Sequence, residues 1–215
     1  MNQTSLETTV KPPTARRVPR GRERRDQLVA VAEHVFLERG FSESTMQMIA
    51  TRAGASKETL YRHFANKEAL FAEVVSRRAI QISGPESGFV SNGAPSVVLF
   101  NLGCNLLKAM TRGEAIALLR LAIAEMPRTP ELGGILYSKG PGTTQDRLTA
   151  YLREATGRGE LRCLNPEQAA KLFLGAVTAN YRVMSLINPM KTKVGDAEIA
   201  DHVRTAVDMF LSYYG

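Results

Sequence analysis

The sequence predicts an all-α protein with a small N-terminal domain and a larger helical C-terminal domain. Apolar residues recur with helical spacing along most of the 215 residues. No segment shows a convincing alternation of apolar and polar residues, which would indicate a strand. Polar capping residues, glycines and prolines separate the periodic segments, as is typical of consecutive helices joined by short loops.

The composition is that of an ordinary globular protein, with 44% hydrophobic and 23% charged residues. No apolar run reaches the roughly 18 residues of a transmembrane helix, and the polar N-terminus does not resemble a signal peptide. Cys104 and Cys163 are far apart and belong to no paired motif, which fits a reduced cytoplasm. We therefore expect a cytoplasmic protein without a membrane partner.

The net charge of +7 is concentrated at the N-terminus. Residues 1–25 contain seven basic and two acidic side chains, whereas residues 26–80 contain seven of each. We expect residues 1–23 to form a disordered basic arm. Two interpretations of this arm remain open: a solvated tail, or a segment that binds a polyanion and releases its counterions.

An apolar stripe predicts the first helix, and Gly40 is expected to end that helix as a left-handed cap. The stripe consists of Leu28, Ala32, Val35 and Phe36. A capping box predicts where the next helix begins, with Ser44 as the N-cap and Gln47 three residues later.

Two short helices around Gly54 have the lengths and the tight turn of a helix-turn-helix. Ala50 is small enough for close packing of the two helices, Gly54 accepts a positive φ, and Leu60 fills the angle between them. Ser56 is the expected N-cap of the second helix of this pair, and Asn66 is the expected N-cap of the helix that follows.

The second short helix of such a motif enters the major groove of DNA, and its first residues contact base edges. Lys57 is the best candidate for a base contact, because an ammonium group donates to guanine O6 and N7. Tyr61 and Lys67 are expected to contact phosphates, although Tyr61 in the core and His63 as a capping or packing residue remain alternatives. The predicted DNA-binding residues are Thr45, Gln47, Ser56, Lys57, Thr59, Tyr61, Arg62, His63 and Lys67.

A segment rich in Gly, Pro, Ser and Asn separates the two domains. We predict a helix-turn-helix domain over 24–80, a linker over 81–95, and a second helical domain over 96–215. In the last domain the expected helices cover 95–112, 114–126, 129–139, 143–156 and 166–187, and a final helix is capped by Asp196.

The last two predicted helices are apolar on two sides, which favours a self-complementary four-helix interface between two copies of the chain. An internal core alone is the alternative interpretation. The predicted interface residues are Leu172, Gly175, Ala176, Ala179, Val183, Val203, Val207 and Phe210.

Residues 40–71, GFSESTMQMIATRAGASKETLYRHFANKEALF, closely resemble the DNA-binding domain of the tetracycline-repressor (TetR) family. The resemblance covers about residues 24–75. The region 117–160 is similar, more weakly, to the C-terminal domains of AefR-like and AcrR-like regulators. Family members contact DNA through positions that match Thr45, Gln47, Ser56, Lys57, Thr59, Tyr61, His63 and Lys67, with Gln47 standing where many members have Arg or Lys.

This resemblance implies a homodimer that binds a near-palindromic operator, usually as a repressor, under the control of a small molecule. It also implies that residues 96–215 form the ligand-binding and dimerisation domain. We expect a mainly apolar pocket between the helices of residues 95–187 and a hydrophobic effector. For each pocket candidate, plain core packing is the alternative. The candidates are Phe100, Cys104, Leu107, Leu118, Leu121, Met126, Tyr137, Phe173, Tyr181 and Met184.

Three other functions can be weighed from the sequence. An enzyme is disfavoured because His34, His63 and His202 belong to different predicted helices and no nucleophile, metal or phosphate-loop motif occurs. We therefore expect no cofactor. A sequence-nonspecific DNA-binding protein would need dispersed basic charge, which residues 26–80 lack. A thiol sensor at Cys104 has only Lys108 as a basic neighbour within one turn.

Overall fold

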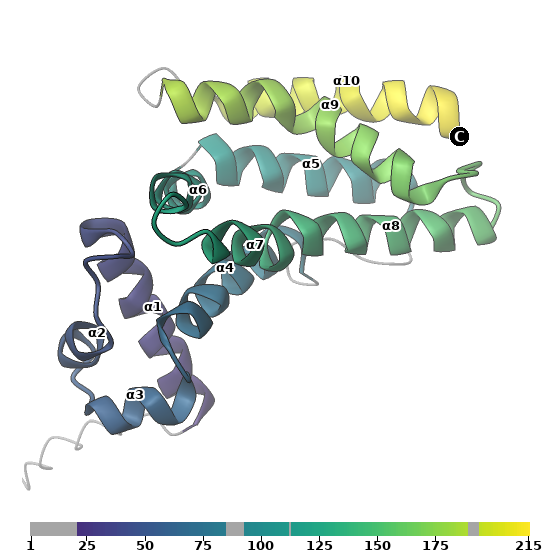
Figure 1. Ribbon diagram of the computed structural model, residues 1–215. Coiled ribbons are helices and arrows are strands. Elements are labelled where there is room, and N and C mark those ends of the chain that lie inside the picture. Colours follow the sequence, from purple (N-terminus) through teal and green to yellow (C-terminus); the bar gives the residue numbers. More distant parts are fainter. Residues whose placement is uncertain (1–20, 85–92, 112, 189–193) are drawn as a thin grey trace, which may run out of the picture.

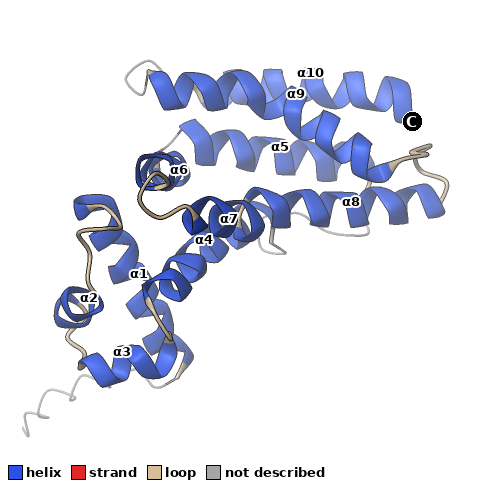
Figure 2. Cartoon of the chain, viewed as in Figure 1, coloured by secondary structure: helices blue, strands red, loops and turns tan. Residues whose placement is uncertain are grey.

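The computed structural model describes residues 21–84, 93–111, 113–188 and 194–215. The described residues form helices without any strand, so the all-α prediction is confirmed (Figure 2). Most of the predicted basic arm and most of the predicted linker lie outside these ranges. The helices are α1 (Arg22–Arg39), α2 (Met46–Arg52), α3 (Lys57–His63), α4 (Lys67–Ser83), α5 (Pro95–Thr111), α6 (Glu114–Glu125), α7 (Glu131–Lys139), α8 (Pro141–Gly157), α9 (Pro166–Ile187) and α10 (Asp196–Tyr214).

The N-terminal domain is built on aromatic packing between α1 and α4. Phe36, Phe41 and Phe71 contact one another, with ring centroids 5.4 to 5.7 Å apart. Ile49 of α2 and Leu60 of α3 are fully buried against the same core. Burying side chains of this size stabilises the domain by about 1.5–3 kcal/mol each, so the short helices α2 and α3 depend on this core for their stability.

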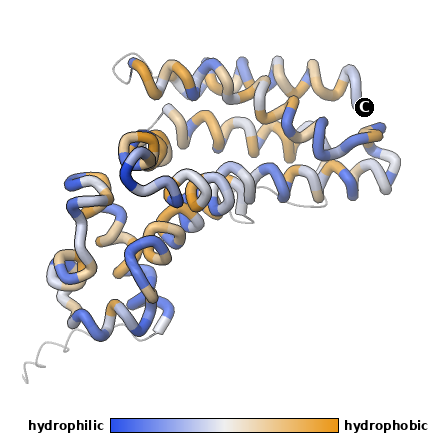
Figure 3. The backbone as a smooth tube through the Cα atoms, in the orientation of Figure 1, coloured by the Kyte–Doolittle hydropathy of each residue, from blue (hydrophilic) through white to orange (hydrophobic). Residues whose placement is uncertain are grey.

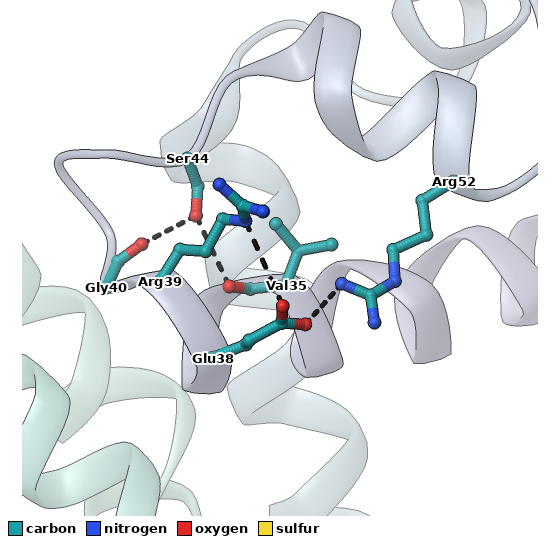
Figure 4. Close-up of polar contacts among 6 residues, drawn as sticks. All are labelled: Val35, Glu38, Arg39, Gly40, Ser44 and Arg52. Atoms are coloured by element: carbon teal, nitrogen blue, oxygen red, sulfur yellow. Dashed lines mark hydrogen bonds and ion pairs between the residues drawn. The ribbon is translucent and has the colours of Figure 1, made fainter.

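The start of α2 differs from the predicted capping box by one residue. Thr45 is the N-cap, and its hydroxyl accepts a hydrogen bond from the Met48 N–H at 3.1 Å. Ser44 is buried instead, and its hydroxyl donates to the Gly40 carbonyl at 2.6 Å (Figure 4). Ser44 and Thr45 both carry a hydroxyl, so the sequence alone does not distinguish which of them is the N-cap of α2.

Gly40 ends α1 with φ 84° and ψ 167°. The positive φ expected of a left-handed cap is confirmed, although ψ lies outside the left-handed helical range. A Cβ at this position would lie 2.9 Å from Glu125 Oε1. Glycine is therefore favoured for its backbone angle, whereas a Cβ would require only the tip of the Glu125 side chain to move.

The C-terminal domain is a layered helical bundle in which α5 packs against α9 and α10, and α8 packs against α9 (Figure 1). Its core contains Tyr151, Phe173 and Phe210, all nearly inaccessible to solvent. Figure 3 shows hydrophobic stretches along α5, α6 and α9. No described helix is long and apolar enough to cross a membrane.

Most predicted helix boundaries in this domain agree with the structure to within one residue, but three helix starts differ. The helix α7 begins at Glu131, whereas 129 was predicted. The helix α8 begins at Pro141, whereas 143 was predicted, and proline suits the first helical position because its missing N–H has no partner there in any case. Asp196 is the first residue of α10, and Gly195 is its N-cap. Asn165 caps α9 as predicted, accepting from the Gln168 N–H at 3.0 Å.

The two domains share apolar contacts. Leu118 and Ala122 of α6 and Leu132 of α7 belong to the hydrophobic core of the N-terminal domain. The helix α4 continues to Ser83, so the predicted boundary at residue 80 falls inside a helix. Three residues (64–66) separate α3 from α4, which packs against α1, α5, α7 and α8, so α4 connects the helix-turn-helix with the C-terminal bundle.

Candidate functional site

The helix-turn-helix is formed by α2, α3 and the turn between them. Gly54 in this turn has φ 57°, a conformation that L side chains rarely adopt. Ala50 is fully buried, and its carbonyl accepts a hydrogen bond from the Ala55 N–H at 2.9 Å. Leu60 is fully buried on the inner side of α3. The three residues selected from the sequence therefore occupy the turn and the inner faces of the two helices.

The outer face of α3 is polar and basic. Lys57, Tyr61 and Arg62 are exposed, and the Lys57 ammonium lies 5.7 Å from the centroid of the Tyr61 ring. Tyr61 retains 45% of its accessible surface, so it does not belong to the core. Thr59 is half-buried, and its hydroxyl forms hydrogen bonds with the Ser56 hydroxyl at 3.1 Å and with Arg62 at 3.4 Å.

The first turn of α3 is fixed by its own polar residues. The Ser56 hydroxyl accepts a hydrogen bond from the Thr59 N–H at 3.1 Å. The pKa of Glu58 is lowered, first by a hydrogen bond with its own backbone N–H and then by the Ser56 hydroxyl. Glu58 therefore stabilises the helix start through the helix dipole, which accounts for an acidic residue beside Lys57.

The remaining predicted DNA contacts lie at the edges of this surface. Thr45 and Gln47 are exposed in the first turn of α2, where the Gln47 amide donates to the Thr51 hydroxyl at 3.3 Å. His63 is half-buried, with its ring 6.2 Å from the Phe64 ring. Eight of the nine predicted residues thus lie on α2, α3 or their N-caps.

Lys67 is the exception, because its ammonium group is used inside the protein. It donates to the carbonyls of Phe41, Ser42 and Ser44 at 2.6, 3.3 and 2.8 Å. It also lies 4.4 Å from the centroid of the Phe41 ring. Three carbonyls match the three donors of an ammonium group, so Lys67 orders the α1–α2 loop (residues 40–45) and is not free to contact phosphate as predicted.

Replacing Lys67 with methionine is expected to reduce the free energy of unfolding by roughly 2 kcal/mol, because charge-assisted hydrogen bonds to partly buried carbonyls are lost. Urea denaturation measures this change. Lys139→Met, at an exposed lysine in α7, serves as the matched control and should change stability little. An equally small effect at both positions would contradict the proposed role of Lys67.

Two arginines that sequence analysis counted only as basic charge hold α1 in place. Arg24 donates to the carbonyls of Ala53 and Gly54 at 3.2 and 2.9 Å, which braces the turn of the helix-turn-helix. Arg25 pairs with Glu73 at 2.6 Å and lies 4.9 Å above the Phe64 ring. In the sequence, both arginines lie one helical turn before Leu28, on the side of the helix that carries the apolar stripe. This spacing could have indicated that they face the rest of the domain.

A cavity of about 360 Å³ lies between α4 and helices of the C-terminal domain and is lined mainly by apolar side chains. Of the predicted pocket residues, Leu118, Met126 and Tyr137 line it. Leu107 and Phe173 belong to the C-terminal core, with Phe100, Cys104 and Tyr181 packed at its edge, and Leu121 packs against the N-terminal core. Met184 is half-buried away from the lining.

Helix α4 supplies a wall of this cavity that sequence analysis missed. Val75, Ala79 and Ile82 line it from α4, and Leu106 and Met110 line it from α5. The predicted pocket was restricted to residues 95–187, because α4 was assigned wholly to the N-terminal domain. In the sequence, α4 carries apolar residues on two sides, including Val75 and Ile82. This pattern could have indicated that both domains pack against the helix.

The two cysteines do not have the properties of reactive thiols. Burial raises the pKa of the Cys104 thiol, with Lys108 opposing this effect. Burial also raises the pKa of Cys163, which is almost inaccessible to solvent. Redox sensing by thiolates requires a lowered pKa and access to solvent, so neither cysteine is favoured for that role.

The helices α9 and α10 present an apolar face to solvent, which we call the α9–α10 face. Its members are Leu172, Gly175, Ala179 and Val183 of α9 and Met209 and Tyr213 of α10. Leu172 and Val183 each retain 54% of their accessible surface, Met209 retains 58% and Tyr213 retains 79%. An exposed apolar patch of this kind marks an interaction surface.

Three of the predicted interface residues are not exposed on the α9–α10 face. Val203, Val207 and Phe210 are buried in the core of their own chain, which contradicts their assignment to an interface. Phe210 contacts Phe173, with ring centroids 5.4 Å apart. The helical spacing identified the apolar residues of α10 correctly, but periodicity alone cannot tell which apolar side meets the chain's own core.

Two family models match the chain. The model described as bacterial regulatory proteins of the tetR family matches residues 28–74, and the model described as the AefR-like transcriptional repressor C-terminal domain matches residues 97–215. The second match alone covers more than half of the chain.

Similar proteins of known name are transcriptional regulators. The transcriptional activator FasR of Mycolicibacterium smegmatis is 48% identical over 61 residues, which is 28% of this chain and 27% of FasR. The transcriptional repressor BepR of Brucella suis is 40% identical over 55 residues, 26% of each chain. The matched segments therefore span only about a quarter of these two relatives.

Solved structures resemble the chain over most of its length. A putative TetR-family regulator from Mesorhizobium loti is 29% identical, with a TM-score of 0.77 over 92% of this chain and 100% of the other. The flavonoid-responsive regulator FrrA is 28% identical, with a TM-score of 0.70 over 89% of this chain and 97% of FrrA. The arrangement of both domains is thus shared with complete regulators.

Proposed function

The chain belongs to the TetR family of transcriptional regulators, and on that premise we propose that it acts as a homodimeric repressor that binds a near-palindromic operator and responds to a small hydrophobic effector. Members of this family bind operator DNA through their helix-turn-helix and carry a ligand-binding C-terminal domain. The main support is the outer face of α3, where Lys57, Tyr61 and Arg62 are exposed, together with the capped start of α2 in the same helix-turn-helix.

In the proposed complex α3 lies in the major groove. Lys57 donates to base edges from the first turn of α3, and Tyr61 reaches a phosphate with its hydroxyl. The free N–H groups at the start of α2, beside Thr45, bind a second phosphate with help from the helix dipole. The basic residues before Arg22 would add contacts that are sensitive to salt concentration.

The α9–α10 face supports the proposed homodimer. It combines protruding side chains, Leu172 and Tyr213, with the small residues Gly175 and Ala179, which allow two helices to approach closely. Related by a two-fold axis, two such faces would bury each other in a four-helix arrangement. The two copies of α3 would then read successive half-sites of the operator.

The cavity supports an effector site that is coupled to the reading helix. Val75, Ala79 and Ile82 form part of its wall on α4, and residues 64–66 alone separate the other end of α4 from α3. A molecule that moved α4 would therefore move α3 as well. Since FrrA is flavonoid-responsive, flavonoids are one class of compound to test as effectors.

Glu125 provides a second connection between the cavity and the helix-turn-helix. Its carboxylate accepts a hydrogen bond from the Ser42 hydroxyl in the α1–α2 loop, and the neighbouring Met126 lines the cavity. The Ser42 hydroxyl is the main cause of the lowered pKa of Glu125. Burial opposes this effect, and the backbone N–H groups of Ser42 and Phe41 add to it.

Glu125→Gln is expected to reduce the free energy of unfolding by about 1–2 kcal/mol at neutral pH, because a charge-assisted hydrogen bond becomes a neutral one. The folded-state pKa of Glu125 is lowered, so its stabilising effect is present above the unfolded pKa, about 4.3. It is lost as pH falls through the lower folded-state value. Urea denaturation from pH 7 to pH 3 should show the two proteins converging at acid pH.

The control for this prediction is Glu154→Gln, at an exposed carboxylate on α8. It should leave the unfolding free energy nearly unchanged throughout the range. A difference between Glu125→Gln and the unmodified chain that stays constant down to pH 3 would show that the carboxylate charge is not what holds the loop.

Footprinting of the DNA beside its own gene tests the proposed function. Protection of two half-sites related by two-fold symmetry is the expected result. Equal affinity for this DNA and for unrelated duplexes would favour the alternative, a sequence-nonspecific DNA-binding protein.

A further inference from the structure

One charged group in the wall of the cavity has no carboxylate partner in the part of the chain that the structure describes. Arg182 of α9 lines the cavity and is half-buried. Its guanidinium donates to the Thr178 hydroxyl at 3.1 Å, and among the described residues no carboxylate lies within ion-pair distance of it. Arg78, the other cation of the wall, differs because it pairs with the buried Glu33 at 2.6 Å.

Thr178 holds the Arg182 guanidinium in position. The Thr178 hydroxyl donates to the Leu174 carbonyl at 2.7 Å, so its oxygen accepts from Arg182 in a fixed direction. Thr178 is itself buried, and both Leu174 and Thr178 line the cavity. A charged donor held in this way loses little conformational freedom when it binds a ligand.

If a neutral apolar ligand filled the cavity, nothing would replace the hydration that the Arg182 guanidinium loses. By filling the cavity the ligand would remove water from the guanidinium, and an arginine cannot lose its proton in response. An anionic group on the same ligand would replace the lost hydration, and a carboxylate matches the planar guanidinium with two parallel hydrogen bonds.

We propose that the effector is an apolar molecule with one carboxylate, which pairs with Arg182 while the apolar body lies against Ile82, Leu118 and Met126. This inference rests on the proposed effector role of the cavity. It refines the hydrophobic effector expected from the sequence, because Arg182 in the cavity wall calls for an anionic group on that molecule.

Isothermal titration calorimetry with decanoate and 1-decanol tests the proposal, since the two probes share an alkyl chain and differ in charge. At pH 7 the full-length protein should bind decanoate at least roughly tenfold more tightly than 1-decanol. Arg182→Gln should abolish this preference, and Arg182→Lys should retain part of it. Arg153→Gln, at an exposed arginine on α8, is the matched control and should leave the preference unchanged.

Equal affinity for the two probes, no binding of decanoate, or an undiminished preference in Arg182→Gln would each overturn the proposal. Circular dichroism melting of each variant shows whether it is folded. If Arg182→Gln is not folded, the preference between the two probes is measured with Arg182→Lys. Failure of the proposed function is separate, because it would appear as a lack of sequence-specific operator binding by the ligand-free protein.

Discussion

Replacing Gly175 with leucine is expected to dissociate the dimer and to weaken operator binding by about 100-fold. The reason is that an overpacked contact costs about 1–3 kcal/mol and occurs twice in a two-fold interface. Gly175 is exposed on α9, and a Cβ added there would meet no atom of its own chain within 4 Å. Leucine also favours a helix over glycine by roughly 0.8 kcal/mol. The folded chain itself should therefore tolerate the change.

Sedimentation velocity measures the dimer directly, and fluorescence anisotropy measures operator binding. Gly134→Leu is the matched control, because Gly134 is also exposed on a helix, α7, and a Cβ there would again meet nothing. The control should remain dimeric. If Gly175→Leu sediments as a dimer of unchanged stability, the α9–α10 face is not the interface.

Lys57→Ala is expected to reduce discrimination between the operator and unrelated DNA by roughly 10- to 100-fold, because one good base contact contributes about 1–3 kcal/mol. Lys57 is exposed in the first turn of α3, the part of the helix that reaches base edges in this motif. Competition binding against single-base variants of the operator shows which base pair loses its effect.

The salt dependence of binding distinguishes a base contact from a phosphate contact. Loss of a phosphate contact would weaken binding to all sequences alike and would lower the salt dependence. That result for Lys57→Ala would contradict its role as a reading residue. Lys139→Ala, at an exposed lysine of α7, should change neither quantity.

The sequence predicted the helices well, because their ends depend on local chemistry. Ser56, Asn66 and Asn165 each cap the predicted helix with the expected side-chain oxygen. Gly54 adopts the positive φ that the turn requires. The family resemblance was carried by this same local pattern, and the matching family models confirm it.

The features that the sequence did not reveal depend on contacts between distant segments. From the sequence, a lysine at position 67 is typical of a phosphate contact. Only the fold brings three carbonyls of the α1–α2 loop to its ammonium group. Val203 and Val207 share the helical spacing of an interface, yet both are buried in the core of their own chain. The cavity wall on α4 likewise arises because the two domains pack together.

Selection of bound duplexes from a random pool tests most directly the central claim, that a two-fold dimer reads DNA through α3. We expect an enriched consensus with two inverted half-sites, bound by two chains per duplex. With Lys57→Ala, the preference at one base pair in each half-site should be lost. Enrichment of no consensus, or of a single half-site bound by one chain, would contradict this claim.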